Sequence, residues 1–233
     1  MLFVHEVHQL VRDAAPTFEE LLRSQWAPAL ARDDDVRLVW CARSAPGAVS
    51  QPEMITWTAV SDGTALERLS ARIRQGDLKS DADRLDAARS AVTRRIVAQL
   101  DFSTLEVDFR TVPRQPEPYR EQGDLYVHDF VPPRPGMQRE FENKLAEVYA
   151  FLLEFEELGT PLWACFETVV GGGPHPENVM VTRVADAEAL VRMLSVEVPR
   201  EAVVPGMWLY DGLRVRDSWT SRLMRTTPWS PIG

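Results

Sequence analysis

An internal repeat is the feature that most constrains the fold of this chain. The segment Leu2–Val7 reads LFVHEV and returns as LYVHDF at Leu125–Phe130, with every position identical or closely similar and 123 positions between the copies. The same spacing relates further pairs downstream: Phe18 and Phe141, Glu19 and Glu142, Leu22 and Leu145, Leu30 and Leu153, Trp40 and Trp163. A fixed internal period outranks local signals. The sequence therefore predicts a tandem duplication.

The repeat divides the 233 residues into two units of ordinary domain size. We expect a first unit over residues 1–112, a linker over residues 113–123 and a second unit over residues 124–233. The linker is rich in proline and charged residues, a composition typical of an extended connection.

Hydrophobic periodicity predicts the same order of elements in both units. In the first we expect a strand at Met1–Val11, a helix opened by Pro16, and strands at Val36–Arg43 and Met54–Val60. A helix capped by Asp62 should then cover Thr64–Gln75, break at Gly76 and resume at Asp81–Leu100, before a strand at Leu105–Thr111. In the second we expect a strand at Leu125–Val131, a helix at Gln138–Leu158, strands at Pro161–Val169 and Asn178–Val184, and helices at Asp186–Val196 and onward to about Arg225, with the fourth strand short or missing. The order is that of an α+β, ferredoxin-like β-α-β-β-α-β unit.

Charge and hydropathy limit the kinds of partner and the cell compartment that we expect for this protein. A net charge of −9 without a basic stripe argues against nucleic-acid binding. No apolar stretch approaches the length of a transmembrane helix, and no signal peptide is evident, so we expect a cytoplasmic protein. Cys41 and Cys165 lie in apolar strand segments and are expected to be buried and reduced, with a disulfide or a nucleophilic role as alternatives.

Sheets of this kind carry helices on one face, and their other face must be buried. Two such sheets facing each other meet this requirement. The pattern Phe18…Trp26-Ala27-Pro28…Trp40, followed by Met54…Trp57 and Asp62, resembles the NIPSNAP-type branch of the dimeric α/β-barrel superfamily. The resemblance implies a cavity between the sheets and a monomer or homodimer. Relatives include cofactor-independent monooxygenases, polyketide cyclases, haem-degrading enzymes and proteins without a known reaction, so the fold alone does not fix the function.

His5 and His128 are the leading candidates for chemistry. They occupy the same position of the repeat, among aromatic residues, and imidazole suits general acid and base catalysis at neutral pH. Glu167, predicted on one strand face with Trp163 and Cys165, is a further candidate base if its strand continues, and otherwise a solvated hairpin residue. Candidate substrate-binding residues are Phe3, Tyr126, Trp40, Trp163, Trp57, Trp208 and Tyr210. The alternatives are core histidines and core aromatic packing, with a plain amphipathic helix for the last two.

Metal binding is not expected at His5-Glu6-Val7-His8. The HExxH motif needs a helix and one more residue between the histidines, whereas residues three apart on a strand point to opposite faces. A haem held by one histidine stays open, and we expect no cofactor. Arg94 and Arg95 are expected on a solvated helix face.

Together these patterns favour a cofactor-independent small-molecule enzyme, a cyclase, isomerase or monooxygenase of biosynthesis, acting on an apolar, aromatic or polyketide-like substrate. The alternative is a non-catalytic small-molecule-binding or structural protein of the same fold.

Overall fold

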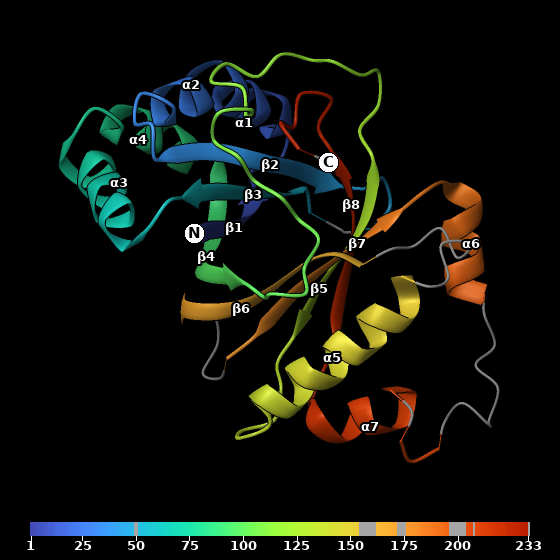
Figure 1. Cartoon of the computed structure of the whole chain (residues 1–233). Coiled ribbons are helices and arrows are strands. Elements are labelled where there is room, and N and C mark those ends of the chain that lie inside the picture. The colour runs from blue at the N-terminus through green and yellow to red at the C-terminus, as the bar shows by residue number, and fades with distance from the viewer. Residues whose placement is uncertain (49–50, 154–161, 172–175, 196–203, 207, 233) are drawn as a thin grey trace. The chain divides into compact units, whose positions relative to one another are not determined.

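The chain forms a mixed α+β structure (Figure 1), in which the computed structural model describes residues 1–48, 51–153, 162–171, 176–195, 204–206 and 208–232. It divides into two compact units. The first contains Met1–Ala98, Glu106–Gly123 and Met224–Gly233, and the second contains Gln99–Leu105 and Asp124–Leu223. The duplication stays a prediction, as do its boundaries at residues 112 and 124. So does the arrangement of two sheets that face each other across a cavity.

The first unit is built on an antiparallel sheet. Its strands are β1 (Leu2–Leu10), β2 (Val36–Ser44), β3 (Glu53–Val60) and β4 (Arg89–Gln99). β1 lies between β4 and β3, and β2 pairs with the other edge of β3. The end of β8 (Thr220–Thr226) extends the sheet, with Thr226 opposite Ala42 of β2.

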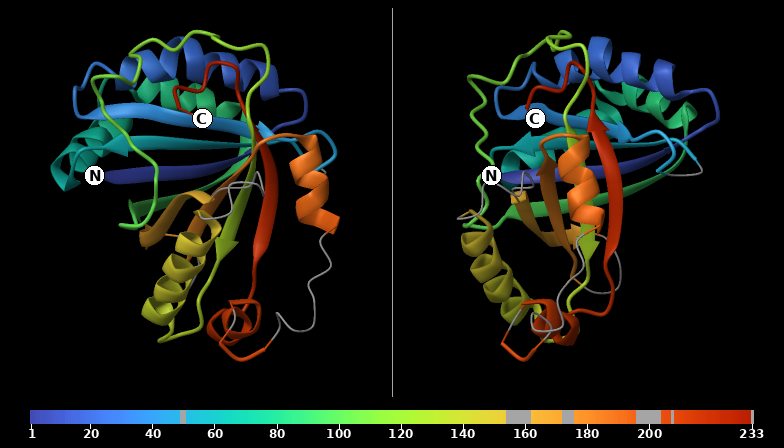
Figure 2. Two further views of the ribbon diagram at one scale, coloured as in Figure 1. Left: turned by 45° about the vertical axis from the view of Figure 1, so that its right-hand side comes forward. Right: turned by 90° about the vertical axis from the view of Figure 1, so that its right-hand side faces the viewer.

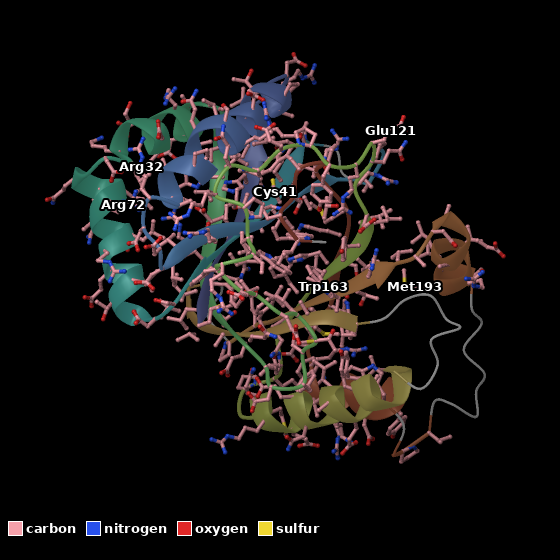
Figure 3. The ribbon with its side chains drawn as sticks, turned by 45° about the horizontal axis from the view of Figure 1, so that its top comes forward. Arg32, Cys41, Arg72, Glu121, Trp163 and Met193 are labelled. Atoms are coloured by element: carbon pink, nitrogen blue, oxygen red, sulfur yellow. The ribbon has the colours of Figure 1, made fainter. Side chains whose placement is uncertain are left out.

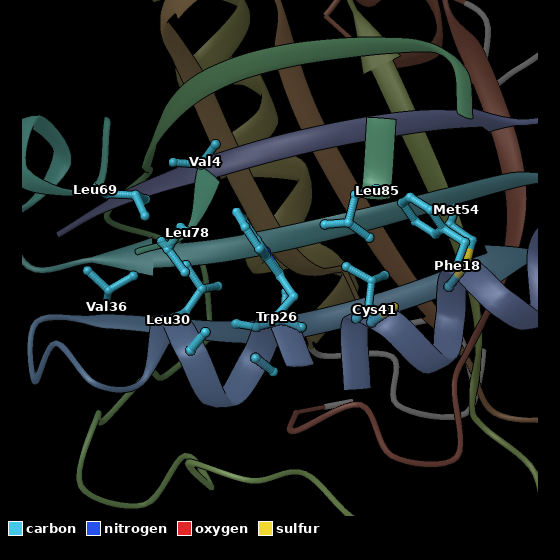
Figure 4. Packing of buried hydrophobic residues seen from close by; sticks show 14 of the residues in the cluster. Val4, Phe18, Trp26, Leu30, Val36, Cys41, Met54, Leu69, Leu78 and Leu85 are labelled. Carbon is cyan, nitrogen blue, oxygen red and sulfur yellow. The ribbon is translucent and has the colours of Figure 1, made fainter. Parts of the chain in front are cut away.

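Helices cover one face of this sheet. They are α1 (Ala15–Leu21), η1 (Leu22–Trp26), α2 (Ala27–Leu30), α3 (Gly63–Gln75) and α4 (Lys79–Ala87), and Figure 2 shows them gathered on one side of the strands. Their apolar side chains meet Val4 and Met54 of the sheet in one buried cluster (Figure 4), to which Phe18 and Leu30 contribute from the first helical segment. Burial of such side chains contributes about 1.5–3 kcal/mol each.

Local chemistry explains where these helices begin and bend. Pro16 lies in the first turn of α1, where its missing N–H costs nothing. The π-helical turn η1 ends just before Pro28, which cannot donate a hydrogen bond to the carbonyl of Ser24. Asp62 caps α3 as predicted, its side chain accepting a hydrogen bond from the Ala65 N–H at 2.8 Å.

Arginine ties the helices of the first unit together. Arg72 of α3 donates to the backbone carbonyls of Ala29 and Leu30, at 2.6 and 3.3 Å. Asp77 then lies within reach of both Arg72, at 2.9 Å, and Arg32, at 3.5 Å, which Figure 3 shows on the helical side of the unit. Charge-assisted contacts of this kind fix the angle at which α3 meets α2.

The second unit repeats the order of elements with fewer helices. Its strands β5 (Leu125–Val131), β7 (Asn178–Val184) and β6 (Leu162–Gly171) pair antiparallel in that order, and β8 begins here; its helices are α5 (Gln138–Leu153), α6 (Ala187–Ser195) and α7 (Trp208–Val215). The predicted end of the first of these helices at Leu158 lies outside the described residues. Phe141, Leu145 and Tyr149 of α5 pack on Val131 and Met180.

Three predicted elements are wrong. Asp81–Leu100 is not one helix: α4 ends at Ala87 and β4 follows. Leu105–Thr111, predicted as a strand, has no regular structure, and the helix predicted to reach Arg225 ends at Val215. The fourth strand of the second repeat, predicted as short or missing, is β8. The residues of β4 and of the end of β8 gain a ladder of hydrogen bonds to a distant strand, which outweighs local helix propensity.

Both cysteines are free and buried, as predicted. Burial raises the pKa of each thiol, Cys41 and Cys165, so neither is a thiolate at neutral pH. No helix among the described residues is long and apolar enough to cross a membrane.

Candidate functional site

The two faces of β1 differ in what covers them. Val4 and Leu10 point into the helix-side cluster, whereas His5 lies on the opposite face, directly between Trp57 of β3 and Arg95 of β4. The His5 side chain is 0% exposed, and its ring centroid lies 6.5 Å from that of Trp57. The alternation predicted from the sequence is therefore confirmed for this strand.

A register shift brings a second tryptophan to this face. The ladder between β2 and β3 is irregular between Leu38 and Trp40, so that Trp40 is paired with Trp57 and stacks on it at 4.5 Å. The next residue, Cys41, turns into the helix-side cluster. Phe3, His5, Trp40 and Trp57 are thus all buried, with the imidazole beside two stacked indoles.

The corresponding face of the second unit carries Tyr126, His128 and Phe130 on β5. All three are buried, and the ring centroids of His128 and Phe130 lie 4.8 Å apart. Trp163 of β6 lies 5.1 Å from Tyr126, and the Arg222 guanidinium lies 4.9 Å from the Phe130 ring centre. Each unit therefore holds one buried imidazole among aromatic rings.

The predicted common face of Trp163, Cys165 and Glu167 is wrong. A register shift between Leu162 and Ala164 places Cys165 in the cluster under α5, whereas Trp163 contacts Tyr126. Glu167 lies within β6, so the strand has not ended there, and it pairs with Asn178 of β7 on the far side of that shift.

The last two predicted binding residues lie on α7. Trp208 packs against Phe141 of α5, with ring centroids 5.7 Å apart, and Tyr210 is 44% exposed. The described contacts place Trp208 on the helix side of the second unit and not with Tyr126 or His128.

Sequence reasoning missed the surroundings of Glu6 and His8. Arg94, predicted on a solvated helix, donates twice to the Glu6 carboxylate, at 2.6 and 3.0 Å, and Arg89 lies 3.8 Å from it. Arg95, the other half of the predicted solvated pair, is buried opposite His5. The sequence did hold a signal for these arginine partners. Glu6 lies on the aliphatic face of its strand, where a buried carboxylate needs a cation.

The hydrogen bonds of His8 define its protonation state. Arg89 can only donate, so its contact of 2.7 Å makes the His8 Nδ1 an acceptor, and Nε2–H then donates to Thr56 Oγ1 at 2.9 Å. Burial, together with the Arg89 charge, lowers the pKa of His8 to about 4. Burial by itself would raise the pKa of Glu6, but the positive charges that His8, Arg94 and Arg89 can carry bring it below its ordinary value. The cluster is therefore a folded-state charge network under Phe18, whose ring lies 4.9 Å from His8.

Asp129 holds the repeat position of Glu6 but has different partners. Burial raises the pKa of Asp129, against hydrogen bonds from Ser221 and Trp219 and the field of Arg216. Ser221 occupies the repeat position of Arg94. The helix-side acid thus carries a guanidinium partner in the first unit and neutral hydrogen-bond donors in the second.

A metal centre is not formed by the described side chains: no group of three His, Cys, Asp or Glu residues among them is placed to hold an ion. His5 contacts Trp57 and His8 contacts Thr56, so these two histidines lie on opposite faces of β1, as predicted.

Comparison with known proteins shows a likeness of structure alone. No protein-family model matches the chain, and no curated protein matches it. An anthrone oxidase-like protein is similar at a TM-score of 0.63 and 12% identity, over 97% of this chain and 91% of that one. A proposed monooxygenase from Lactobacillus acidophilus NCFM is similar at 0.59 and 10%, over 97% and 93%. A chlorite dismutase variant from Candidatus Nitrospira defluvii is similar at 0.53 and 6%, over 98% and 92%. These likenesses show that the chain has the fold of the dimeric α/β-barrel proteins.

Proposed function

We propose that this protein is a small-molecule enzyme of the oxidase or monooxygenase type that works without an organic cofactor. Its substrate is an apolar, aromatic or polyketide-like molecule, and His5 and His128 are its acid and base. The observation that supports the proposal most directly is the buried imidazole of His5 against the stacked pair of Trp40 and Trp57. The same proposal includes a NIPSNAP-type relationship and an origin by tandem duplication. It also includes a monomeric or homodimeric state.

The aromatic surroundings suit a flat ligand. Indole and phenol rings attract other rings through offset or edge-to-face contacts worth about 0.5–1.5 kcal/mol each beyond their buried area. Trp40 and Trp57 supply such rings beside His5, and Tyr126 and Trp163 supply them in the unit of His128. Proteins with this fold include one described as anthrone oxidase-like, which is consistent with a polycyclic phenol as substrate.

The chemistry would begin with proton transfer. A neutral imidazole accepts a proton from a carbon or a phenolic oxygen that a neighbouring carbonyl of the substrate makes acidic. The carbanion or phenolate that results is the species that isomerises, cyclises or reacts with dioxygen. Glu167 is a third candidate acid or base in the proposal, and Phe3 is a further binding residue. Trp208 packs on the helix side, so α7, with Trp208 and Tyr210, is left out of the binding site.

The second candidate function is binding without catalysis. The same aromatic faces favour it, because a buried histidine that donates and accepts hydrogen bonds can orient a ligand without transferring a proton.

A pair of substitutions on one strand tests the proposal. His5→Gln removes proton transfer on the aromatic face, and His8→Gln is its matched control on the helix side. We expect turnover of an anthrone or a related phenol, followed by oxygen uptake and product absorbance, to fall about 10²–10⁴-fold in His5→Gln or His128→Gln. In folded His8→Gln it should stay within threefold.

Ligand binding separates the two functions. Quenching of tryptophan fluorescence by the same phenol should persist in His5→Gln, since Trp40 and Trp57 remain. If the phenol binds but neither histidine variant loses tenfold in turnover, the histidines are not catalytic and the binding function replaces the enzymatic one.

A further inference from the structure

A groove on the first unit lies at the start of β2, where Arg37 is on the same sheet face as Phe3 and Trp57. It forms where Glu106–Gly123 passes across the start of β2, the green segment that crosses this strand in Figure 1. The groove encloses about 470 Å³ and is lined by Asp34, Arg37 and the run from Phe109 to Arg114. This volume is that of a site for a small organic molecule.

The guanidinium of Arg37 is the group in this groove that can bind an anion. Its side chain is 3% exposed, and Nη1 donates to the backbone carbonyls of Asp33 and Val36, each at 2.7 Å. Among the described residues Nε has no hydrogen-bond partner, and Nη2 comes only within 3.9 Å of the Asp34 carboxylate. A buried donor without an acceptor is costly. The Nε–Nη2 edge of a guanidinium is also the edge that can take a carboxylate or phosphate with two parallel hydrogen bonds.

Two more guanidiniums stand around the same space. Arg114 donates to the Ala31 carbonyl at 2.7 Å and to Asp34, and Arg110 is held by Asp108 at 2.8 Å. The lining thus carries three cations and one anion. Burial and the nearby Arg114 charge both lower the pKa of Arg37, a strain that a bound anion would relieve.

An aromatic ring completes the site. The Arg37 guanidinium lies 5.9 Å from the centre of the Phe109 ring, which is half-buried. An anionic group on the guanidiniums would place an attached flat body beside this ring.

We propose that this groove is a binding site for a small organic oxyanion, a carboxylate or phosphate monoester with a flat apolar body. The anionic group binds the Nε–Nη2 edge of Arg37 together with Arg114, and the body packs against Phe109. Asp34 occupies the approach to both arginines, and its carboxylate, 82% exposed, turns aside into water when the ligand enters. The lining of this groove includes none of the residues assigned to the proposed function.

The probes are benzoate and phenyl phosphate, with benzamide as the neutral counterpart, titrated into the intact protein and followed by calorimetry and by amide NMR shifts. We expect at least one anion to bind at least tenfold more tightly than benzamide, to weaken with salt, and to shift the amides of Phe109–Arg114. The two anions together distinguish a carboxylate site from a phosphate site.

Two variants are expected to change the affinity for the anion in opposite directions. Arg114→Gln, at an exposed position, should weaken binding at least tenfold, and Asp34→Asn should tighten it at least threefold by removing the competing carboxylate. Arg74→Gln, an exposed arginine on α3, is the matched control and should change affinity less than twofold. Arg37→Gln should abolish anion binding if this variant folds. If it does not fold, the affinity of Arg114→Gln is the deciding measurement. Equal binding of benzamide, or equal weakening by Arg74→Gln, overturns the proposal.

Discussion

The buried His8 should make the stability of the first unit depend on pH. In the folded protein Nδ1 accepts from Arg89, so a second proton on the ring would face a guanidinium. The pKa of His8 is accordingly lowered to about 4, whereas in the unfolded chain it lies near 6.5. Between these values protonation favours the unfolded chain, so stability that is present at pH 7 is lost as the pH falls toward 4.

The size of the effect follows from the two pKa values. Each proton taken up only by the unfolded chain costs about 1.4 kcal/mol per pH unit, which amounts to about 2 kcal/mol between pH 7 and pH 5. Glu6 titrates mainly below this interval, because its pKa is also lowered. A loss of this size is a large part of the stability of an ordinary domain.

The assay is urea unfolding at pH 7, 6 and 5 for the natural chain and for His8→Gln. We expect the natural chain to lose about 2 kcal/mol more than His8→Gln over this range. Leu69→Ala is the control: it leaves a cavity in the helix-side cluster but keeps His8 and the Phe18 ring on it, so it should lower stability at all three pH values and leave the pH dependence unchanged. Equal pH dependence in the natural chain and His8→Gln would refute the reasoning.

Three further outcomes are expected. Glu6→Gln should cost about 3 kcal/mol in urea unfolding, because it strips a buried carboxylate from Arg94; a loss under 1 kcal/mol contradicts the network. Asp62→Ala should cost about 1 kcal/mol through the lost cap of α3, with Asp62→Asn nearly neutral as its control. Cys41 and Cys165 should resist a water-soluble thiol reagent at pH 8 until denaturant is added, and rapid labelling of both would show that they are accessible.

Local sequence predicted much of the strand framework. The alternation along β1 correctly separated His5 from Val4, because side chains on a strand point to alternate faces whatever the rest of the fold does. The same holds for helix starts, since Pro16 and Asp62 act on backbone groups within one turn of themselves.

Interruptions of the alternation were invisible in the sequence. The register shifts beside Trp40 and Trp163 depend on how two strands pair. The shift in β2 brings Trp40 to the face of Trp57, and the shift in β6 separates Trp163 from Cys165, two positions away. An error of one residue moves a side chain across the sheet, which is why the common face predicted for Glu167 failed.

Long-range pairing decided what local propensity could not. The residues from Arg89 to Gln99 follow a helix directly, yet they form β4 because β1 offers them a full ladder and Glu6 offers Arg94 a charge partner. His5 likewise acquires Trp57 and Arg95 as neighbours only through two ladders that join positions far apart in the chain. The sequence by itself determined which residues share a face of an uninterrupted strand such as β1, because there side chains two positions apart point the same way. The tertiary structure alone decided which strands form and which charges meet, because those free energies come from residues tens of positions apart.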